Sequence, residues 1–206
     1  KERIGVCFKP NDIRCVAGLE LDSELAYLVG RALVDFLKCK DIIVGEDMRV
    51  SSDKLKRAFI KGIIKQGAKA IDIGKIDSPG LYFASGYLKK PAAMITASHN
   101  PAKYNGIKIT KETAIPLNND NGLLDIKNLV GNNKFSAASK EGKTVKYNIL
   151  KHYKKHIRSF INSKKLDIKV VVDAGNGMAG KIFPIIYSDL GMDVIKLDFK
   201  LDGTFP

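Results

Sequence analysis

Apolar residues recur along this chain at two spacings, one typical of helices and one typical of buried strands. Over residues 23–38 they fall at i, i+3, i+4, i+7 and i+8, which places one apolar stripe along an α-helix. Two further helices are predicted over residues 53–66 and 78–88. Short apolar runs predict strands, at residues 4–8, 42–45, 70–73 and 92–96.

This alternation of strands and helices predicts an α/β fold over residues 1–148. The expected architecture has three layers, α/β/α, around a mostly parallel mixed sheet. In such sheets ligands bind beyond the carboxyl ends of the strands. Residues 46–49 and 98–100 both lie at such ends, although Asp47 and Arg49 themselves read as an ordinary surface pair or a strand-end turn.

After Thr110 the pattern becomes less regular. A helix is predicted over residues 118–130, a polar surface connection over 131–143, and a domain boundary near residue 148. Residues 149–206 then predict two helices and two strands, at 152–161, 168–173, 178–190 and 193–199. Two strands and one crossover helix cannot cover both faces of a sheet. We therefore expect an incomplete second α/β domain, and a chain that is the N-terminal piece of a longer protein.

The composition is that of a globular protein, with 45% hydrophobic residues in 206. No apolar run approaches the roughly 20 residues that span a bilayer, and no leader precedes the first apolar segment, so we expect a cytoplasmic protein without membrane partners. Cys7, Cys15 and Cys39 lack C-x-x-C spacing and are expected to be buried or half-buried thiols.

The formal net charge of +13 raises the question of nucleic-acid binding. The first 50 residues carry 8 basic and 9 acidic side chains, and only six of the 35 basic residues are arginines. Because the excess is spread out and consists mostly of lysine, no nucleic-acid partner is expected. A phosphorylated small molecule uses the same positive field.

The segment T-A-S-H-N-P-A-K-Y, residues 96–104, holds the strongest candidate chemistry. Ser98 follows an apolar strand and has His99, Asn100, Lys103 and Lys108 nearby in the sequence. Cations of this kind can offset the charge of a phosphoserine, whereas the G-x-S-x-G pattern of acyl-transferring serines is absent. The alternative is a plain turn, because Asn-Pro and Asn-Gly pairs are common in turns.

A second motif competes with the first. Gly175, Gly177 and Gly180 form G-x-G-x-x-G between a strand and a helix, with Asp198 at the position of a ribose-binding acid. Asp173 and Pro184 count against a bound pyrophosphate, because one adds negative charge and the other interrupts the helix. A dinucleotide-binding oxidoreductase or binding module therefore stays as the alternative function.

A histidine pair raises a metal site as a further possibility. His152 and His156 have the i, i+4 spacing of a zinc pair on a helix. Neighbouring lysines and the lack of a third ligand favour a solvated helix face.

Six segments resemble the α-D-phosphohexomutases, and most of all their phosphomannomutase/phosphoglucomutase branch. They occur in the family's order and approximate spacing, at residues 8–14, 45–52, 96–101, 104–108, 171–177 and 202–206. The resemblance covers nearly the whole chain, as domain 1 and part of domain 2 of a four-domain enzyme. One departure is Cys15, where the family has glycine after Asp-Ile-Arg, so the loop around Arg14 is expected to be shaped differently.

The resemblance implies a phosphotransferase that interconverts hexose 1-phosphates and hexose 6-phosphates through a hexose 1,6-bisphosphate. It implies that Ser98 is the phosphoserine, that Arg14 and Lys108 contact the transferring phosphoryl group, and that His99 and Asn100 flank the serine. It also implies Mg²⁺ as cofactor, with the Ser98 phosphate as one ligand and the other ligands beyond residue 206. These residues alone are therefore expected to be inactive. The preference among mannose, glucose and glucosamine phosphates stays open, with the first two favoured.

Overall fold

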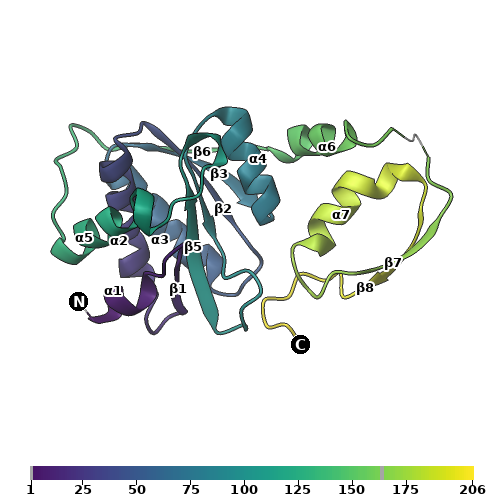
Figure 1. Ribbon diagram of the computed structural model, residues 1–206, viewed down its shortest axis with the longest axis horizontal. Coiled ribbons are helices and arrows are strands. Elements are labelled where there is room, and N and C mark those ends of the chain that lie inside the picture. The colour runs from purple at the N-terminus through teal and green to yellow at the C-terminus, as the bar shows by residue number, and fades with distance from the viewer. Residues whose placement is uncertain (1, 163–164) are drawn as a thin grey trace.

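The computed structural model describes residues 2–162 and 165–206 (Figure 1). Its larger sheet has six strands in the order β1-β5-β4-β2-β3-β6. β2 is parallel to β3 and β4, and β3 is parallel to β6, whereas β5 is antiparallel to both β1 and β4. The predicted α/β fold with a mostly parallel mixed sheet is confirmed. The strands are β1 (Ile13–Val16), β2 (Asp41–Glu46), β3 (Lys69–Lys75), β4 (Ala92–Ile95), β5 (Tyr104–Thr110) and β6 (Thr144–Lys146).

Helices cover both faces of this sheet (Figure 1). Because successive strand residues point to opposite faces, Ile42 and Val44 of β2 enter one core and Ile43 enters the other. The first core lies under three helices, α2 (Ser23–Leu37), α3 (Ser52–Lys65) and α5 (Leu123–Asn132). The second lies under α4 (Ser78–Leu88) and α6 (Leu150–Arg158), and it extends to a further helix described below. Short 3-10 turns, η1 (Glu112–Ala114) and η2 (Asn119–Asn121), precede α5.

Two glycines bring α2 and α3 into backbone contact. A Cβ at Gly30 would lie 2.3 Å from the carbonyl oxygen of Phe59, and a Cβ at Gly62 would lie 2.0 Å from the carbonyl oxygen of Tyr27. Real side chains do not come so close, so only glycine permits this packing. The position of α3 matters for the site, because its first turn begins at Ser52, beside the end of β2.

The predicted strand at residues 4–8 is wrong, because this segment forms a helix, α1 (Glu2–Cys7). A strand would point Ile4, Val6 and Phe8 to one face, but Val6 is 43% exposed. The buried side chains are instead Cys7 and Phe8, with Ile4 packed against the same core. The spacing i, i+3, i+4 is that of a helix, and six residues are too few to distinguish the two patterns in the sequence.

A second sheet follows α6. β7 (Lys169–Asp173) and β8 (Asp193–Leu197) are parallel and are connected by α7 (Ala179–Tyr187) and η3 (Ser188–Leu190). Ile182 and Ile186 of α7 join the core that also contains Tyr153 of α6. Apolar side chains remain exposed on this two-stranded sheet, at Val171, Ile195 and Leu197.

The cysteines are buried or half-buried, as expected, but two of them are not free thiols. Cys7 and Cys15 form a disulfide with Cα atoms 5.1 Å apart, which joins α1 to β1, and Cys39 is free. Within the residues that the structure describes, no helix is both long and apolar enough to cross a membrane.

Candidate active site

Ser98 lies in the loop between β4 and β5, here called the Ser98 loop (residues 96–103). The side chains of Ser98 and His99 are exposed, and the backbone of Ser98 is left-handed, with φ at +55°. The Ser98 amide donates to Thr96 Oγ1 at 2.9 Å, and Asn100 Nδ2 donates to the carbonyl oxygen of Ala97 at 2.7 Å. Asn100 therefore braces the loop, while the serine and the histidine point to solvent.

Strand pairing brings Arg14 and Lys108 together on one face of the sheet. Arg14 of β1 is opposite Gly106 of β5, and Lys108 lies two residues further along β5, which makes the two basic side chains diagonal neighbours. Between them lies Asp12, which is 6% exposed. Its carboxylate is 3.8 Å from Arg14 Nη2 and 3.4 Å from Lys108 Nζ. Sequence reasoning found the two cations but missed the carboxylate that they share.

Gly106 allows three strand ends to meet beside the loop. A Cβ on this residue would lie 2.3 Å from the carbonyl oxygen of Ile13 and 2.9 Å from that of Thr96. The Thr96 amide donates to the Gly106 carbonyl at 3.0 Å. The start of the Ser98 loop and the strand that carries Arg14 are therefore both in contact with the same residue of β5.

Asp47, directly after β2, is the centre of a buried hydrogen-bond network. It is 4% exposed and accepts hydrogen bonds from Ser52 Oγ and Thr96 Oγ1, each at 2.6 Å, and from the Arg49 amide at 3.0 Å. Asn105 Nδ2 donates to Ser52 Oγ at 3.0 Å. One carboxylate thus connects the ends of β2 and β4 with the first turn of α3.

Arg49 is buried, so the expectation of a surface pair was wrong. Its guanidinium donates to four backbone carbonyls in or next to the Ser98 loop, those of Ser98, Asn100, Pro101 and Tyr104. Nε lies 3.3 Å from Asp47 Oδ2 as an ion pair. Burial lowers the pKa of Arg49, and Asp47 offsets part of that effect. Arginine retains its proton at neutral pH even so. No local pattern could reveal this burial, because the carbonyls come about fifty residues later.

The glycine-rich motif has a structural use in this fold. A Cβ at Gly180 would lie 2.1 Å from the carbonyl oxygen of Phe199, so glycine permits the start of α7 to contact the chain after β8. Gly175 has φ at +49°, and its amide donates to Asp173 Oδ1 at 2.8 Å. Asn176 donates through Nδ2 to the carbonyl of Lys200 at 3.1 Å. Tight turn geometry and close packing account for these glycines without a dinucleotide.

His152 and His156 take part in aromatic contacts with α4. His152 stacks on Tyr87, with ring centroids 4.8 Å apart, and its Nδ1 is 3.0 Å from the Tyr87 hydroxyl. His156 stacks on Phe83 at 4.8 Å. The predicted solvated face is confirmed for His156, which is exposed, whereas His152 is half-buried against α4.

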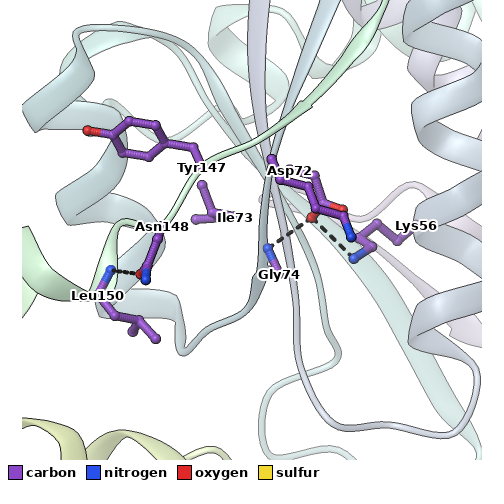
Figure 2. Close-up of a pocket in the computed structure, with 8 residues that line it drawn as sticks. Lys56, Asp72, Ile73, Gly74, Tyr147, Asn148 and Leu150 are labelled. Atoms are coloured by element: carbon purple, nitrogen blue, oxygen red, sulfur yellow. Dashed lines mark hydrogen bonds and ion pairs between the residues drawn. The ribbon is translucent and has the colours of Figure 1, made fainter.

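A pocket of about 580 Å³ has a lining that includes Lys56, Asp72, Gly74 and Tyr147 (Figure 2). Lys56 Nζ is 2.7 Å from Glu46 Oε1 and 3.2 Å from Asp72 Oδ1. Its positive charge is thus compensated inside the protein. The pocket contains none of the residues that the sequence singled out for chemistry.

These features define a three-layer α/β/α domain with an exposed serine at the carboxyl edge of its sheet and two basic side chains on the adjoining strand pair. The family model described as phosphoglucomutase/phosphomannomutase, alpha/beta/alpha domain I, matches residues 5–137. The chain therefore belongs to the phosphoglucomutase/phosphomannomutase family, and the resemblance seen in the sequence is confirmed.

Individual relatives agree with this assignment. The chain is 37% identical to a phosphomannomutase of Vibrio cholerae and 38% identical to one of Escherichia coli K12, each over 97% of this chain and 46% of the relative. A crystal structure of a phosphoglucomutase/phosphomannomutase family protein from Burkholderia thailandensis superposes with a TM-score of 0.88 at 28% identity, over 97% of this chain and 45% of that one. The chain spans about half the length of the curated relatives it matches.

Proposed function

We propose that the whole protein is a phosphohexomutase, with mannose and glucose phosphates as its favoured substrates. The observation that carries the proposal is the placement of an exposed Ser98 on a braced loop beside the Arg14–Lys108 pair. Membership of the family and relatives named phosphomannomutase support the same reaction. The role of each residue is part of the proposal.

In the proposed reaction, phosphorylated Ser98 donates its phosphoryl group to the free hydroxyl of a hexose 1- or 6-phosphate. The Oγ–P bond breaks, a P–O bond to the sugar forms, and the sugar hydroxyl loses its proton to a nearby base or to water, while Ser98 Oγ takes up a proton as it leaves. His99 is placed beside the serine. The resulting bisphosphate reorients in the site and returns its other phosphoryl group to Ser98. Arg14 and Lys108 supply the positive charge that such a transfer needs, and Asn100 maintains the loop.

Mg²⁺ is part of the proposal, although the residues that the structure describes do not offer a complete site for it. Magnesium prefers six oxygen ligands in near-octahedral geometry, and a phosphate oxygen on Ser98 would be one of them. Among residues 2–162 and 165–206, no cluster of three or more histidine, cysteine or acidic side chains could hold a metal ion. The residues described here therefore do not by themselves fit a tight magnesium site.

Intact-mass analysis of the full-length protein tests the phosphoserine. Wild-type protein should carry one phosphate that the Ser98→Ala variant lacks, and mutase activity of S98A should fall at least ~10³-fold, because the covalent carrier is gone. Ser139→Ala, at an exposed serine outside the site, is the matched control and should keep both the phosphate and the activity. Active wild-type protein without a phosphate adduct would contradict the mechanism.

We also propose that residues 1–206 alone do not turn over substrate, because the basic pair and the Ser98 loop form only part of a site. Incubation of this chain with mannose 1-phosphate or glucose 1-phosphate, Mg²⁺ and a bisphosphate activator tests this point. Measurable formation of the 6-phosphate would contradict it.

A further inference from the structure

The Ser98 loop is held in an uncommon conformation by one side chain from a different strand end. Ser98 has positive φ, which serine adopts rarely without local support. Inside the loop, the Asn100 amide donates to the Ala97 carbonyl at 3.1 Å. Three further carbonyls of the loop, those of Ser98, Asn100 and Pro101, accept hydrogen bonds from Arg49, and those of Ser98 and Pro101 lie 2.8 and 2.9 Å from its terminal nitrogens. Removal of the guanidinium would leave several partly buried carbonyls without a donor.

The geometry of this contact is specific to arginine. Its two terminal nitrogens carry four N–H groups in one plane, and these meet four carbonyls, two on each nitrogen. Lysine offers three N–H groups on a single nitrogen and lacks the planar fork. The side chain of Arg49 is 0% exposed, so water cannot replace a missing hydrogen bond.

One face of the planar guanidinium is covered by the segment after β8, at residues 202–205. The Phe205 ring lies over Arg49, with its centroid 5.0 Å from Cζ. Gly203 packs on the backbone next to Arg49, where a Cβ would lie 2.6 Å from the Val50 amide nitrogen. Asp202 holds this turn, because its Oδ1 accepts from the Thr204 amide at 2.9 Å. Phe205 therefore shields the guanidinium and limits its movement away from the loop.

We propose that Arg49, covered by Phe205, is the positioning residue that presents Ser98 for phosphoryl transfer. Arg49 acts through the loop backbone and does not touch the reacting atoms. The expected effect of Arg49 on kcat rests on the proposed mutase function. Its expected effect on the mobility of the Ser98 loop is independent of that function. Loss of the four-carbonyl contact releases the loop, and a misplacement of about 1 Å at a reacting group is enough to cost about 10²-fold in rate.

The test compares Arg49→Lys, Phe205→Leu and Arg31→Lys in the full-length protein. Hydrogen–deuterium exchange of the Ser98 loop and steady-state kinetics with mannose 1-phosphate are measured for each. R49K should exchange at least ~10-fold faster in the loop and lose about 10²-fold in kcat, with KM changed less than about threefold. F205L keeps the hydrogen bonds and should show the same effects in weaker form, with exchange about threefold faster than wild type and kcat about tenfold lower.

Arg31→Lys is the matched control because Arg31 has interactions of the same kinds in a different place. Its Nε donates to Gln66 Oε1 at 3.0 Å, and its guanidinium lies 4.3 Å from the Phe135 ring centroid. R31K should keep wild-type exchange in the Ser98 loop and wild-type kcat. A merely structural role for Arg49 predicts that R49K and R31K lose activity only in proportion to the unfolded fraction.

Each outcome decides a part of the proposal. R49K with wild-type exchange in the loop, or with unchanged kcat, would overturn the role of Arg49, and F205L that matches wild type in both would overturn the role of Phe205. If R49K fails to fold, the F205L result alone decides. Wild-type protein without phosphate on Ser98 and without mutase activity refutes the proposed function instead, and the exchange measurement then still judges whether Arg49 holds the loop.

Discussion

Replacing Lys56 with methionine removes the charge that compensates two carboxylates inside the protein, those of Glu46 and Asp72. Figure 2 shows the contact between Lys56 and Asp72. The side chains of Lys56 and Glu46 are 9% and 6% exposed, and their charged atoms are 2.7 Å apart. Methionine keeps most of the methylene packing of lysine but cannot donate a hydrogen bond. The Lys56→Met variant therefore tests the charge itself with little change in volume.

The expected cost is about 3–5 kcal/mol of unfolding free energy at neutral pH, because removing one partner leaves a buried charge uncompensated. The lower half of this range is expected, since Asp72 is 16% exposed and also accepts a hydrogen bond from the Gly74 amide at 2.9 Å. Most of the cost falls on Glu46, whose Oε2 has no hydrogen-bond partner within the described ranges. The double variant Glu46→Gln, Lys56→Met removes both charges and should lie within about 1.5 kcal/mol of wild type.

Urea unfolding measures these differences. The chain contains no tryptophan, so the transition is followed by far-UV circular dichroism. Lys54→Met, an exposed lysine on the same helix, is the matched control and should change stability by no more than about 0.5 kcal/mol.

The pH dependence gives a second check on Lys56. Burial opposes its charged form, but the hydrogen bond and the negative charge of Glu46 raise the pKa of Lys56. Stability from a raised folded-state pKa is fully present below the unfolded pKa of about 10.4 and is lost as the pH rises through the folded value. The K56M deficit should therefore be constant near neutral pH and should narrow above about pH 10.4, as the pH rises through the folded-state pKa of Lys56. A neutral-pH cost below about 1 kcal/mol, or a double variant as unstable as K56M, would show that Lys56 does not compensate a buried charge.

Two further predictions concern other titratable groups. Burial opposes ionisation of Asp41, but hydrogen bonds from Lys69 and Lys90 lower its pKa, so its contribution is present above about pH 4 and is lost as the pH falls through the lower folded-state value. Asp41→Asn should cost about 1 kcal/mol in urea titrations at pH 7 and nothing near pH 2, and an equal deficit at both would contradict charge pairing. Burial raises the pKa of Cys39 to about 11. Iodoacetamide should therefore label Cys39 in the folded protein at least ~10-fold more slowly than in concentrated urea, and rapid labelling of folded protein would exclude this protection.

The hydrophobic pattern predicted the elements that are long enough to show a clear apolar spacing in the local sequence. The helix over residues 78–88 was predicted with the bounds that the structure has, and the stripe over residues 23–38 became α2 with one residue less. β1 and β6 were missed because they have four and three residues, too few to show an alternation. Short strands depend on the partner that they pair with, which no local window contains.

The candidate site was predictable only in the part that depends on local sequence. Ser98 follows a continuous buried strand, so its place at the sheet edge follows from local sequence and the α/β pattern. Asp12 and Arg49 were missed or misread, because the burial of each depends on partners far along the chain, Lys108 in one case and the Ser98 loop in the other.

The reciprocal glycine contact between α2 and α3 has a consequence for how mutations at these glycines are tolerated and compensated. Gly30 receives the carbonyl of Phe59, three residues before Gly62, and Gly62 receives the carbonyl of Tyr27, three residues before Gly30. A side chain at either position would force α2 and α3 apart where they pack together. This would shift the first turn of α3, where Ser52 contacts Asp47. The effect of such a mutation would therefore be a change at the contact between Ser52 and Asp47, which is distant in the sequence from Gly30. Compensating changes should then arise around Asp47 rather than beside the glycines.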